Sequence, residues 1–145
     1  MNHTSNTVKV FFEGVEKASN SIDLDLVATQ YEDTFLFANP DGARAIEKQK
    51  FLAVLPKRYE FFKSMGHRST QVLSLEETPI DREYTMVRAY FLMSFEKETM
   101  PLMEIKVDSV YILHIKDNSV KIVMHIEHED LQKAMQARGL LPVDQ

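Results

Sequence analysis

The sequence predicts an α+β domain in which helices pack on a strongly curved antiparallel sheet, forming a cone with an internal pocket. The first observation is the order of the elements. Helical periodicity dominates residues 7–66, and strand-like segments follow one another over residues 68–127. Helices segregated from an antiparallel sheet are typical of the α+β class. The second observation is the length of the segment Glu83–Glu96, since strands this long must twist and bend around a core.

The composition predicts a single globular domain over residues 1–145, because the length suits one domain and 44% of the residues are apolar. The 17 Lys and Arg against 22 Asp and Glu give a net charge of −5, which argues against nucleic acid as a partner. The absence of cysteine excludes disulfides and thiolate metal sites and is typical of a cytoplasmic protein. No signal peptide or membrane-spanning run is visible, so we expect no membrane association.

The first half of the chain predicts two helices and a strand. Apolar residues recur at helical spacing over Thr7–Ser19, and one of the polar residues before it is expected to cap the helix. Ile22–Tyr31 follows as a short second helix with Asp23 as its cap. Thr34–Asn39 is rich in strand-forming residues and ends at a strong turn signal, Asn39-Pro40-Asp41-Gly42.

The middle of the chain predicts two more helices and then strands. Pro56 interrupts the next helical pattern, and a proline there ends one helix or opens another. We therefore expect helices over Glu47–Leu55 and Pro56–Met65. Strands are expected over Arg68–Glu77 and over Glu83–Glu96.

The segment Leu102–Glu129 predicts two strands folded back on each other at Lys116–Ser119. Residues two apart share a face of a strand. The first strand therefore has a mostly apolar face, expected to line the cone, made of Ile105, Val107, Ser109, Tyr111, Leu113 and Ile115. The second strand places Ile122, Met124 and Ile126 on one face and Val123, His125 and Glu127 on the other. A short helix over Asp130–Arg138 is expected to follow.

His125 and Glu127 are the strongest candidates for chemistry, because a carboxylate two residues from an imidazole can orient it and raise its basicity. The alternative is that this face points outward and that Ile122, Met124 and Ile126 form the core. The tyrosines Tyr31, Tyr90 and Tyr111 offer hydroxyls to a ligand, or are core residues whose hydroxyls bond to the backbone. No metal site is expected, since cysteine and the His-Glu-x-x-His motif are both absent.

Three motifs in this order resemble the nuclear transport factor 2-like superfamily, which includes the SnoaL-like polyketide cyclases and the ketosteroid isomerases. The first is Tyr31-Glu32-Asp33 followed by the strand that ends at Asn39-Pro40-Asp41-Gly42. The second is the last strand, Lys121–Glu127, and the third is the tail Leu131–Pro142. The resemblance covers nearly the whole chain and implies the cone-shaped fold predicted above.

The resemblance also bears on activity. Ketosteroid isomerases carry a carboxylate base where this sequence has Asn39, a helix tyrosine where it has Val15, and a buried aspartate near Tyr111. Without a base and two donors their mechanism is not expected here. SnoaL-like cyclases carry an acid/base aspartate on the last strand, where this sequence has Glu127. The resemblance therefore favours His125 and Glu127 facing the inside of the cone.

The expected function is that of a small-molecule-binding protein or a cofactor-independent enzyme acting on an apolar or aromatic ligand. As an enzyme it would catalyse proton transfer, cyclisation or hydration/dehydration, with His125 as base and Glu127 as its orienter or the acid. Tyr111 and Asn39 would donate hydrogen bonds to a developing oxyanion. The remaining ligand contacts are expected from Tyr31, Tyr90, Ser109 and Leu113.

Apolar groups on the outer face of the sheet, such as Val110 and Ile112, predict a homodimer. The alternative function is that of a non-catalytic interaction or accessory domain whose cone is filled by its own side chains. An open cavity of roughly 300 Å³ or more would favour the ligand-binding reading over the filled cone.

Overall fold

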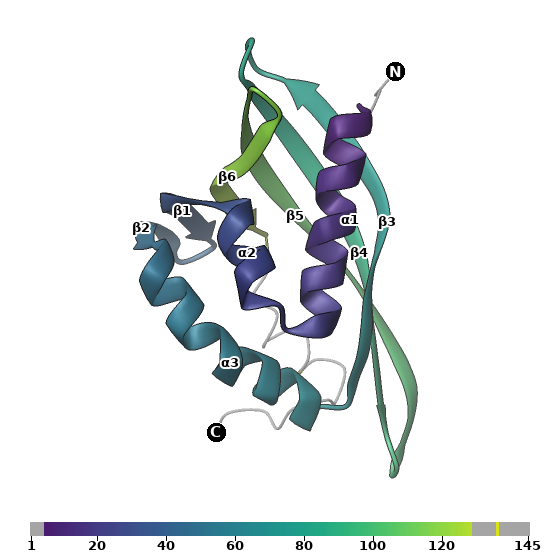
Figure 1. Ribbon diagram of the computed structural model, residues 1–145. Helices are drawn as coiled ribbons and strands as arrows, with labels where there is room; N and C mark the ends of the chain where they lie inside the picture. The colour runs from purple at the N-terminus through teal and green to yellow at the C-terminus, as the bar shows by residue number, and fades with distance from the viewer. Residues whose placement is uncertain (1–4, 129–135, 137–145) are drawn as a thin grey trace.

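The computed structural model describes residues 5–128 and residue 136. In these residues three helices cover one face of a six-stranded sheet (Figure 1). The helices are α1 (Asn6–Ser21), α2 (Leu24–Gln30) and α3 (Lys48–Ser64). The strands are β1 (Tyr31–Asn39), β2 (Gly42–Glu47), β3 (His67–Pro79), β4 (Tyr84–Lys97), β5 (Met100–Lys116) and β6 (Ser119–Glu127). The predicted α+β class is confirmed. The terminal helix expected over Asp130–Arg138 lies outside the described residues, apart from residue 136.

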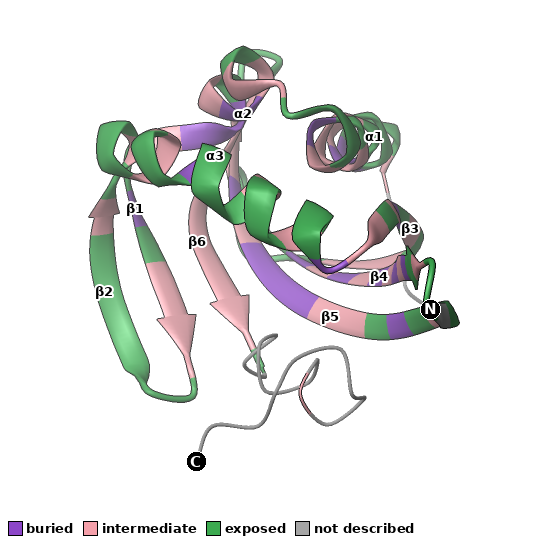
Figure 2. Ribbon diagram, turned by 90° about the horizontal axis from the view of Figure 1, so that it is seen from below, coloured by how far each residue is buried: buried purple, intermediate pink, exposed green. Residues whose placement is uncertain are grey.

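The sheet is strongly curved beneath the helices, as Figure 2 shows. Its strand order is β2-β1-β6-β5-β4-β3, and neighbouring strands are antiparallel except for the parallel pair β1 and β6. The parallel pair brings β1, the first strand of the chain, against the last described strand. Among the described residues, no helix is long and apolar enough to cross a membrane.

Side chains of α1 cover the edge strand β3. The Asn20 amide accepts from the Thr70 N–H at 2.8 Å and donates to the Thr70 carbonyl at 2.9 Å. The Glu16 carboxylate accepts from the Val72 N–H at 2.7 Å. These bonds satisfy backbone groups that an edge strand would otherwise leave open to pairing with another chain.

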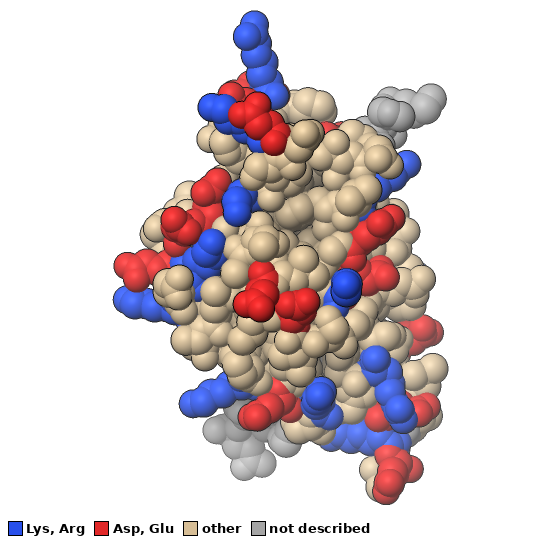
Figure 3. Space-filling view, viewed as in Figure 1, with Lys and Arg blue, Asp and Glu red and all other residues tan. Residues whose placement is uncertain are grey.

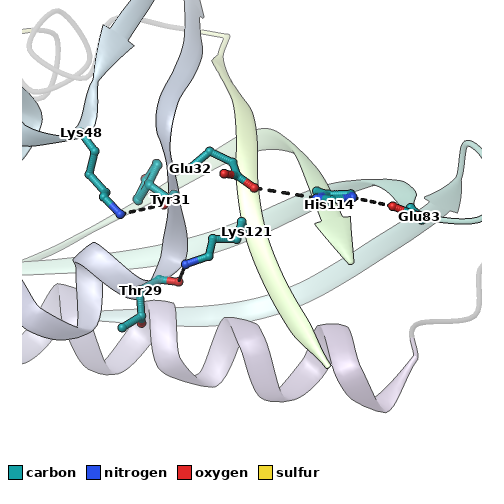
Figure 4. Close-up of polar contacts among 7 residues, drawn as sticks. All are labelled: Thr29, Tyr31, Glu32, Lys48, Glu83, His114 and Lys121. Atoms are coloured by element: carbon teal, nitrogen blue, oxygen red, sulfur yellow. Dashed lines mark hydrogen bonds and ion pairs between the residues drawn. The ribbon is translucent and has the colours of Figure 1, made fainter. Parts of the chain in front are cut away.

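Polar contacts hold α2 and the start of β1, the segment that carries Gln30 and Tyr31 (Figure 4). The Lys121 ammonium donates to the Thr29 carbonyl at 3.3 Å, and the Lys48 ammonium donates to the Tyr31 carbonyl at 3.4 Å. Cations suit the C-terminal end of a helix, where carbonyls lack partners and the dipole is negative. Both lysines therefore fix the position of Gln30, the last residue of α2, and of Tyr31, the first residue of β1.

The helix α3 runs through Pro56 without a break, so the prediction of two helices divided there was wrong. The proline removes one N–H from the helix, but Pro56 lies on the exposed side, where water can reach the freed carbonyl. On the opposite side Leu55 is buried, and Phe51 and Tyr59 pack against the core. This packing outweighs the local preference of proline. The strand β2 was not predicted: Gly42 was assigned to the turn, Glu47 to the next helix, and residues 43–46 to no element.

A β-bulge in β6 changes which side chains face the helices. Leu113 pairs with Ile122, whereas Ile112 pairs with Met124, so Val123 is an extra residue on β6. The alternation therefore shifts by one between Ile122 and His125. Ile122 is 1% exposed in the core, and His125 also faces the helices. The expectation that these two side chains lie on opposite faces was wrong.

Candidate functional site

A cavity of about 200 Å³ lies between the helices and the sheet. Its wall combines side chains from all three helices and from β1, β3, β4, β5 and β6. The central part of the sheet wall is apolar, with Phe91, Met93 and Val107. Polar side chains lie toward β6 on one side of this apolar part and toward β3 on the other.

His125 is held in the wall by aromatic rings from both neighbouring strands. It pairs with Tyr111 on β5 and with Phe37 on β1. The imidazole stacks on Tyr111, with ring centroids 4.4 Å apart, and meets the Phe37 ring edge-on at 5.5 Å. Its Nε2 atom is buried and has no hydrogen-bond partner among the described residues. The site thus presents an oriented imidazole nitrogen that the protein does not satisfy.

Two opposite charges lie beside this imidazole. The Glu127 Oε1 atom is 3.8 Å from His125 Nε2 and 4.0 Å from Arg58 Nη2. The Arg58 guanidinium also lies over the Phe62 ring, 5.3 Å from its centroid. The first distance is too long for a hydrogen bond, so Glu127 does not satisfy the imidazole nitrogen.

The protonation states in the cavity follow from burial. Burial, and then the Arg58 charge, lower the pKa of His125 from 6.5 to about 3. Burial also lowers the pKa of His67. Burial raises the pKa of Tyr31 and of Tyr111 above the ordinary value. Near neutral pH both imidazoles and both phenols are therefore uncharged and able to exchange hydrogen bonds with a ligand.

Gln30, the last residue of α2, adds a second unsatisfied group to the wall. The residue is 5% exposed, and its Nε2 atom has no hydrogen-bond partner within the described part of the chain. Gly14 on α1 faces this amide, since a Cβ atom there would lie 3.4 Å from Gln30 Nε2. A larger residue at position 14 would crowd the amide.

On the β3 side, His67 and Thr70 line the cavity and bond to each other, with 2.9 Å between Nε2 and Oγ1. Their polar atoms are thus partnered, in contrast to those of Gln30 and His125. Within the described residues, no three His, Cys, Asp or Glu side chains are grouped as metal ligands would be.

The structure brings five of the eight predicted site residues to the cavity wall: Tyr31, Ser109, Tyr111, His125 and Glu127. The other three lie elsewhere. Leu113 is 0% exposed inside the apolar core. Tyr90 lies on the outer face of β4, because its neighbours Ala89 and Phe91 are the buried, helix-facing residues. The Asn39 side chain accepts from the Asp41 N–H at 2.9 Å in the turn after β1.

Sequence reasoning missed Gln30, Arg58, His67 and Thr70. A signal for Arg58 was present, because Leu55, Tyr59 and Phe62 are its neighbours at i−3, i+1 and i+4, and all four line the cavity. No comparable local signal marks Gln30 or Thr70, since both reach the cavity only through the packing of α2 and β3.

No family model matches the chain, and no curated protein matches it in sequence. Solved structures match it in fold. An NTF2-like protein of unknown function from Shewanella oneidensis is 16% identical over 86% of this chain and 98% of its own, with a TM-score of 0.66. An NTF2-like protein with a cystatin-like fold from Novosphingobium aromaticivorans is 10% identical over 94% and 88%, with a TM-score of 0.68.

The β subunit of the benzoate 1,2-dioxygenase from Burkholderia mallei is 14% identical over 92% of this chain and 95% of its own, with a TM-score of 0.66. Identities this low show the fold and not the chemistry. The chain therefore has the α+β fold of the two NTF2-like proteins, a fold described as cystatin-like in the second of them.

Proposed function

We propose that the protein binds a small, largely apolar molecule in the cavity of the cone, with the polar part of the ligand at His125 and Gln30. The observation that carries this proposal is the buried Nε2 atom of His125, a residue of the cavity wall, which has no hydrogen-bond partner among the described residues. A buried polar group left unsatisfied costs about 1–3 kcal/mol. A ligand that supplies the missing partner recovers this cost.

The size of the cavity supports a small ligand. Its volume of about 200 Å³ is below the roughly 300–1,000 Å³ of pockets for drug-sized molecules. At about 30 Å³ for each water molecule, it has room for about six or seven waters. The cone is thus narrower than expected, but the described side chains do not fill it. The volume does not reach the roughly 300 Å³ that would favour ligand binding on size alone, so the support for binding comes from the unsatisfied atoms of two residues in the wall.

Ligand binding is tested with the variant His125→Phe, which keeps a ring in the aromatic stack and removes both nitrogens. The protein is first examined for a co-purified molecule by native mass spectrometry and then titrated calorimetrically with small alcohols and ketones. We expect His125→Phe to weaken binding about tenfold or more. His114→Phe, the same change on the outer face, should leave affinity unchanged. Equal affinities for the wild type and His125→Phe would contradict the proposal.

Catalysis of the SnoaL-like type is the second candidate function. In this mechanism His125 is the base, Glu127 orients it and Tyr111 is the hydrogen-bond donor. The position of all three side chains in one wall supports these roles, with 3.8 Å between His125 Nε2 and Glu127 Oε1. This chemistry needs no redox cofactor. However, an imidazole whose pKa is about 3 is a weak base at neutral pH, because efficient bases have a pKa near the working pH. We therefore place binding first.

A homodimer through the outer face of the sheet is the proposed assembly. Met86, Ile112, Met124 and Leu36 pair in one row across β4, β5, β6 and β1. Met86 is 36% and Leu36 is 45% exposed. A continuous apolar row of this kind is a surface that two copies can bury against each other. Val110, expected in this surface, is 5% exposed and adds little.

The dimer is tested by light scattering coupled to gel filtration. We expect Ile112→Glu to convert a dimer into a monomer, because the substitution places a charge in the middle of the row. Lys106→Glu, a charge substitution at a more distant position of the same strand, serves as the control. A monomeric wild-type protein would contradict the proposal.

The charge pattern gives no support for nucleic-acid binding. On the face drawn in Figure 3, the Lys and Arg side chains are interspersed with Asp and Glu. Nucleic-acid binding needs a concentrated basic surface. The absence of a nucleic-acid partner and the cytoplasmic location both stay predictions.

A further inference from the structure

We propose that the ligand of the cavity is an uncharged, oxygen-bearing molecule of the alcohol or carbonyl class, because the opposite charges in the cavity wall face each other and its unsatisfied groups are neutral. This inference rests on the proposed function and names the ligand class of the same site. It excludes simple carboxylates and amines, which an apolar pocket of this size could otherwise accommodate.

The charged side chains of the described wall are Arg58 and Glu127, and they have opposite signs. Their closest atoms, Nη2 and Oε1, are 4.0 Å apart, with the Arg58 side chain 51% exposed and the Glu127 side chain 22% exposed, so each charge offsets part of the field of the other. A ligand that brings its own charge would leave one of three charges without a counterpart beside His125 and Glu127, the more buried side of this group. Such an unbalanced charge is expensive to bury.

The other titratable groups of the wall add no charge near neutral pH. His125 and His67 are neutral because burial lowers the pKa of each. The hydroxyls of Tyr31, Tyr59 and Tyr111 are neutral at this pH even with an ordinary pKa, and burial raises the pKa of each further. The wall therefore offers hydrogen bonds without a net charge from these groups.

The two unsatisfied atoms define what the ligand must supply. The Gln30 amide nitrogen can only donate, so it requires an acceptor oxygen on the ligand. His125 Nε2 donates or accepts according to its tautomer. A hydroxyl serves both atoms, and a carbonyl serves the amide and the donor tautomer of the imidazole. An ammonium group accepts from neither, and a carboxylate would place a second anion near Glu127.

Three probes with the same phenylpropyl skeleton test the ligand class: phenylpropanol, phenylpropanoate and phenylpropylamine. Calorimetric titration of the full chain near neutral pH compares their affinities. We expect phenylpropanol to bind at least tenfold more tightly than either ion. Preferential or equal binding of an ion would overturn this inference and leave the proposed function standing. If none of the three binds, both fail.

Variants of the charge pair provide the sharper test, because each removes one charge and leaves a polar side chain in its place. Glu127→Gln leaves Arg58 without its counterion and should shift the preference toward phenylpropanoate by about tenfold. Arg58→Gln should shift it toward phenylpropylamine by a similar factor. The double variant R58Q/E127Q should prefer the alcohol again.

The control variant is Arg68→Gln, which removes an exposed arginine paired with Glu96 outside the cavity wall. It should leave all three affinities unchanged. Thermal unfolding of each variant establishes that it is folded. If folded single variants keep the wild-type order of affinities, charge balance does not select the ligand and the inference is overturned.

Discussion

Two histidines of the same β-ribbon are surrounded by similar groups on opposite faces of the sheet. His125 on β6 stacks on Tyr111 with ring centroids 4.4 Å apart, and His114 on β5 stacks on Tyr84 with centroids 4.7 Å apart. Each also has a glutamate nearby. The His114 Nε2 atom is 2.7 Å from Glu83 Oε1, whereas the His125 Nε2 atom is 3.8 Å from Glu127 Oε1.

The difference lies in burial and hydrogen bonding. On the outer face, the His114 ring lies between the carboxylates of Glu83 and Glu32, and its Nε2 atom is hydrogen-bonded to Glu83 (Figure 4). On the inner face, the Nε2 atom of His125 is buried without a partner among the described residues. Residue types alone therefore do not distinguish a structural histidine from a candidate site, but an unsatisfied nitrogen on a residue of the cavity wall does.

The largest expected difference between the two histidines is in acid stability. The pKa of His125 is about 3 in the folded protein and ordinarily 6.5, so below pH 6.5 the unfolded chain binds a proton that the folded protein does not. Stability from this group is complete above pH 6.5 and is lost as pH falls toward 3. At 1.36 kcal/mol for each pKa unit, the loss is about 4–5 kcal/mol. Urea unfolding at a series of pH values measures it.

The variants His125→Phe and His114→Phe separate this contribution from those of the carboxylates. His125→Phe should lose its share of the decline between pH 6.5 and 3, and His114→Phe should retain it. Parallel curves for the wild type and His125→Phe would show that the imidazole is protonated as easily in the folded protein as in the unfolded chain.

The stacked tyrosines should differ next. Tyr111 is 5% exposed and Tyr84 is 38% exposed. Removing a large buried aromatic ring costs about 3–5 kcal/mol, so we expect Tyr111→Ala to lose this much. Tyr84→Ala should lose about 1 kcal/mol or less. Urea unfolding at neutral pH measures both, and equal losses would contradict the assignment of the two faces.

Much of this two-faced arrangement could be predicted from the sequence, because it follows from periodicity. The alternation from Ile105 to Ile115 predicts the inner face of β5, and the structure agrees at Tyr111 and Leu113. The rule that alternate residues share a face fails on β6, because the extra residue Val123 makes both Ile122 and His125 face the helices. A bulge is fixed by pairing with the neighbouring strand, and the local sequence carries no mark of it. Pro56 fails as a helix boundary for a similar reason, because tertiary packing decides the outcome.

The candidate site was only partly predictable for the same physical reason. His125 and Glu127 were found because they stand two apart in one strand. Arg58 was not, because it comes from a helix whose distance from β6 is set by the fold. In the sequence, Gln30 is an ordinary polar residue at the end of a helix, and only its burial in the structure marks it as part of the site. Side chains that come from different helices and strands can be recognised as one site only once the structure shows the cavity that they line.

The smallest expected effect concerns the ion pair of the outer histidine. Glu83→Gln removes the carboxylate charge, whose Oε1 atom lies 2.7 Å from His114 Nε2. The side chains of His114 and Glu83 are 24% and 44% exposed. Pairs this open to water contribute about 0.2–1 kcal/mol, so we expect a loss in that range. Because salt screens exposed charges, the loss should shrink when unfolding is measured in about 1 M salt. A salt-independent loss above about 2 kcal/mol would contradict the exposure of this pair to water.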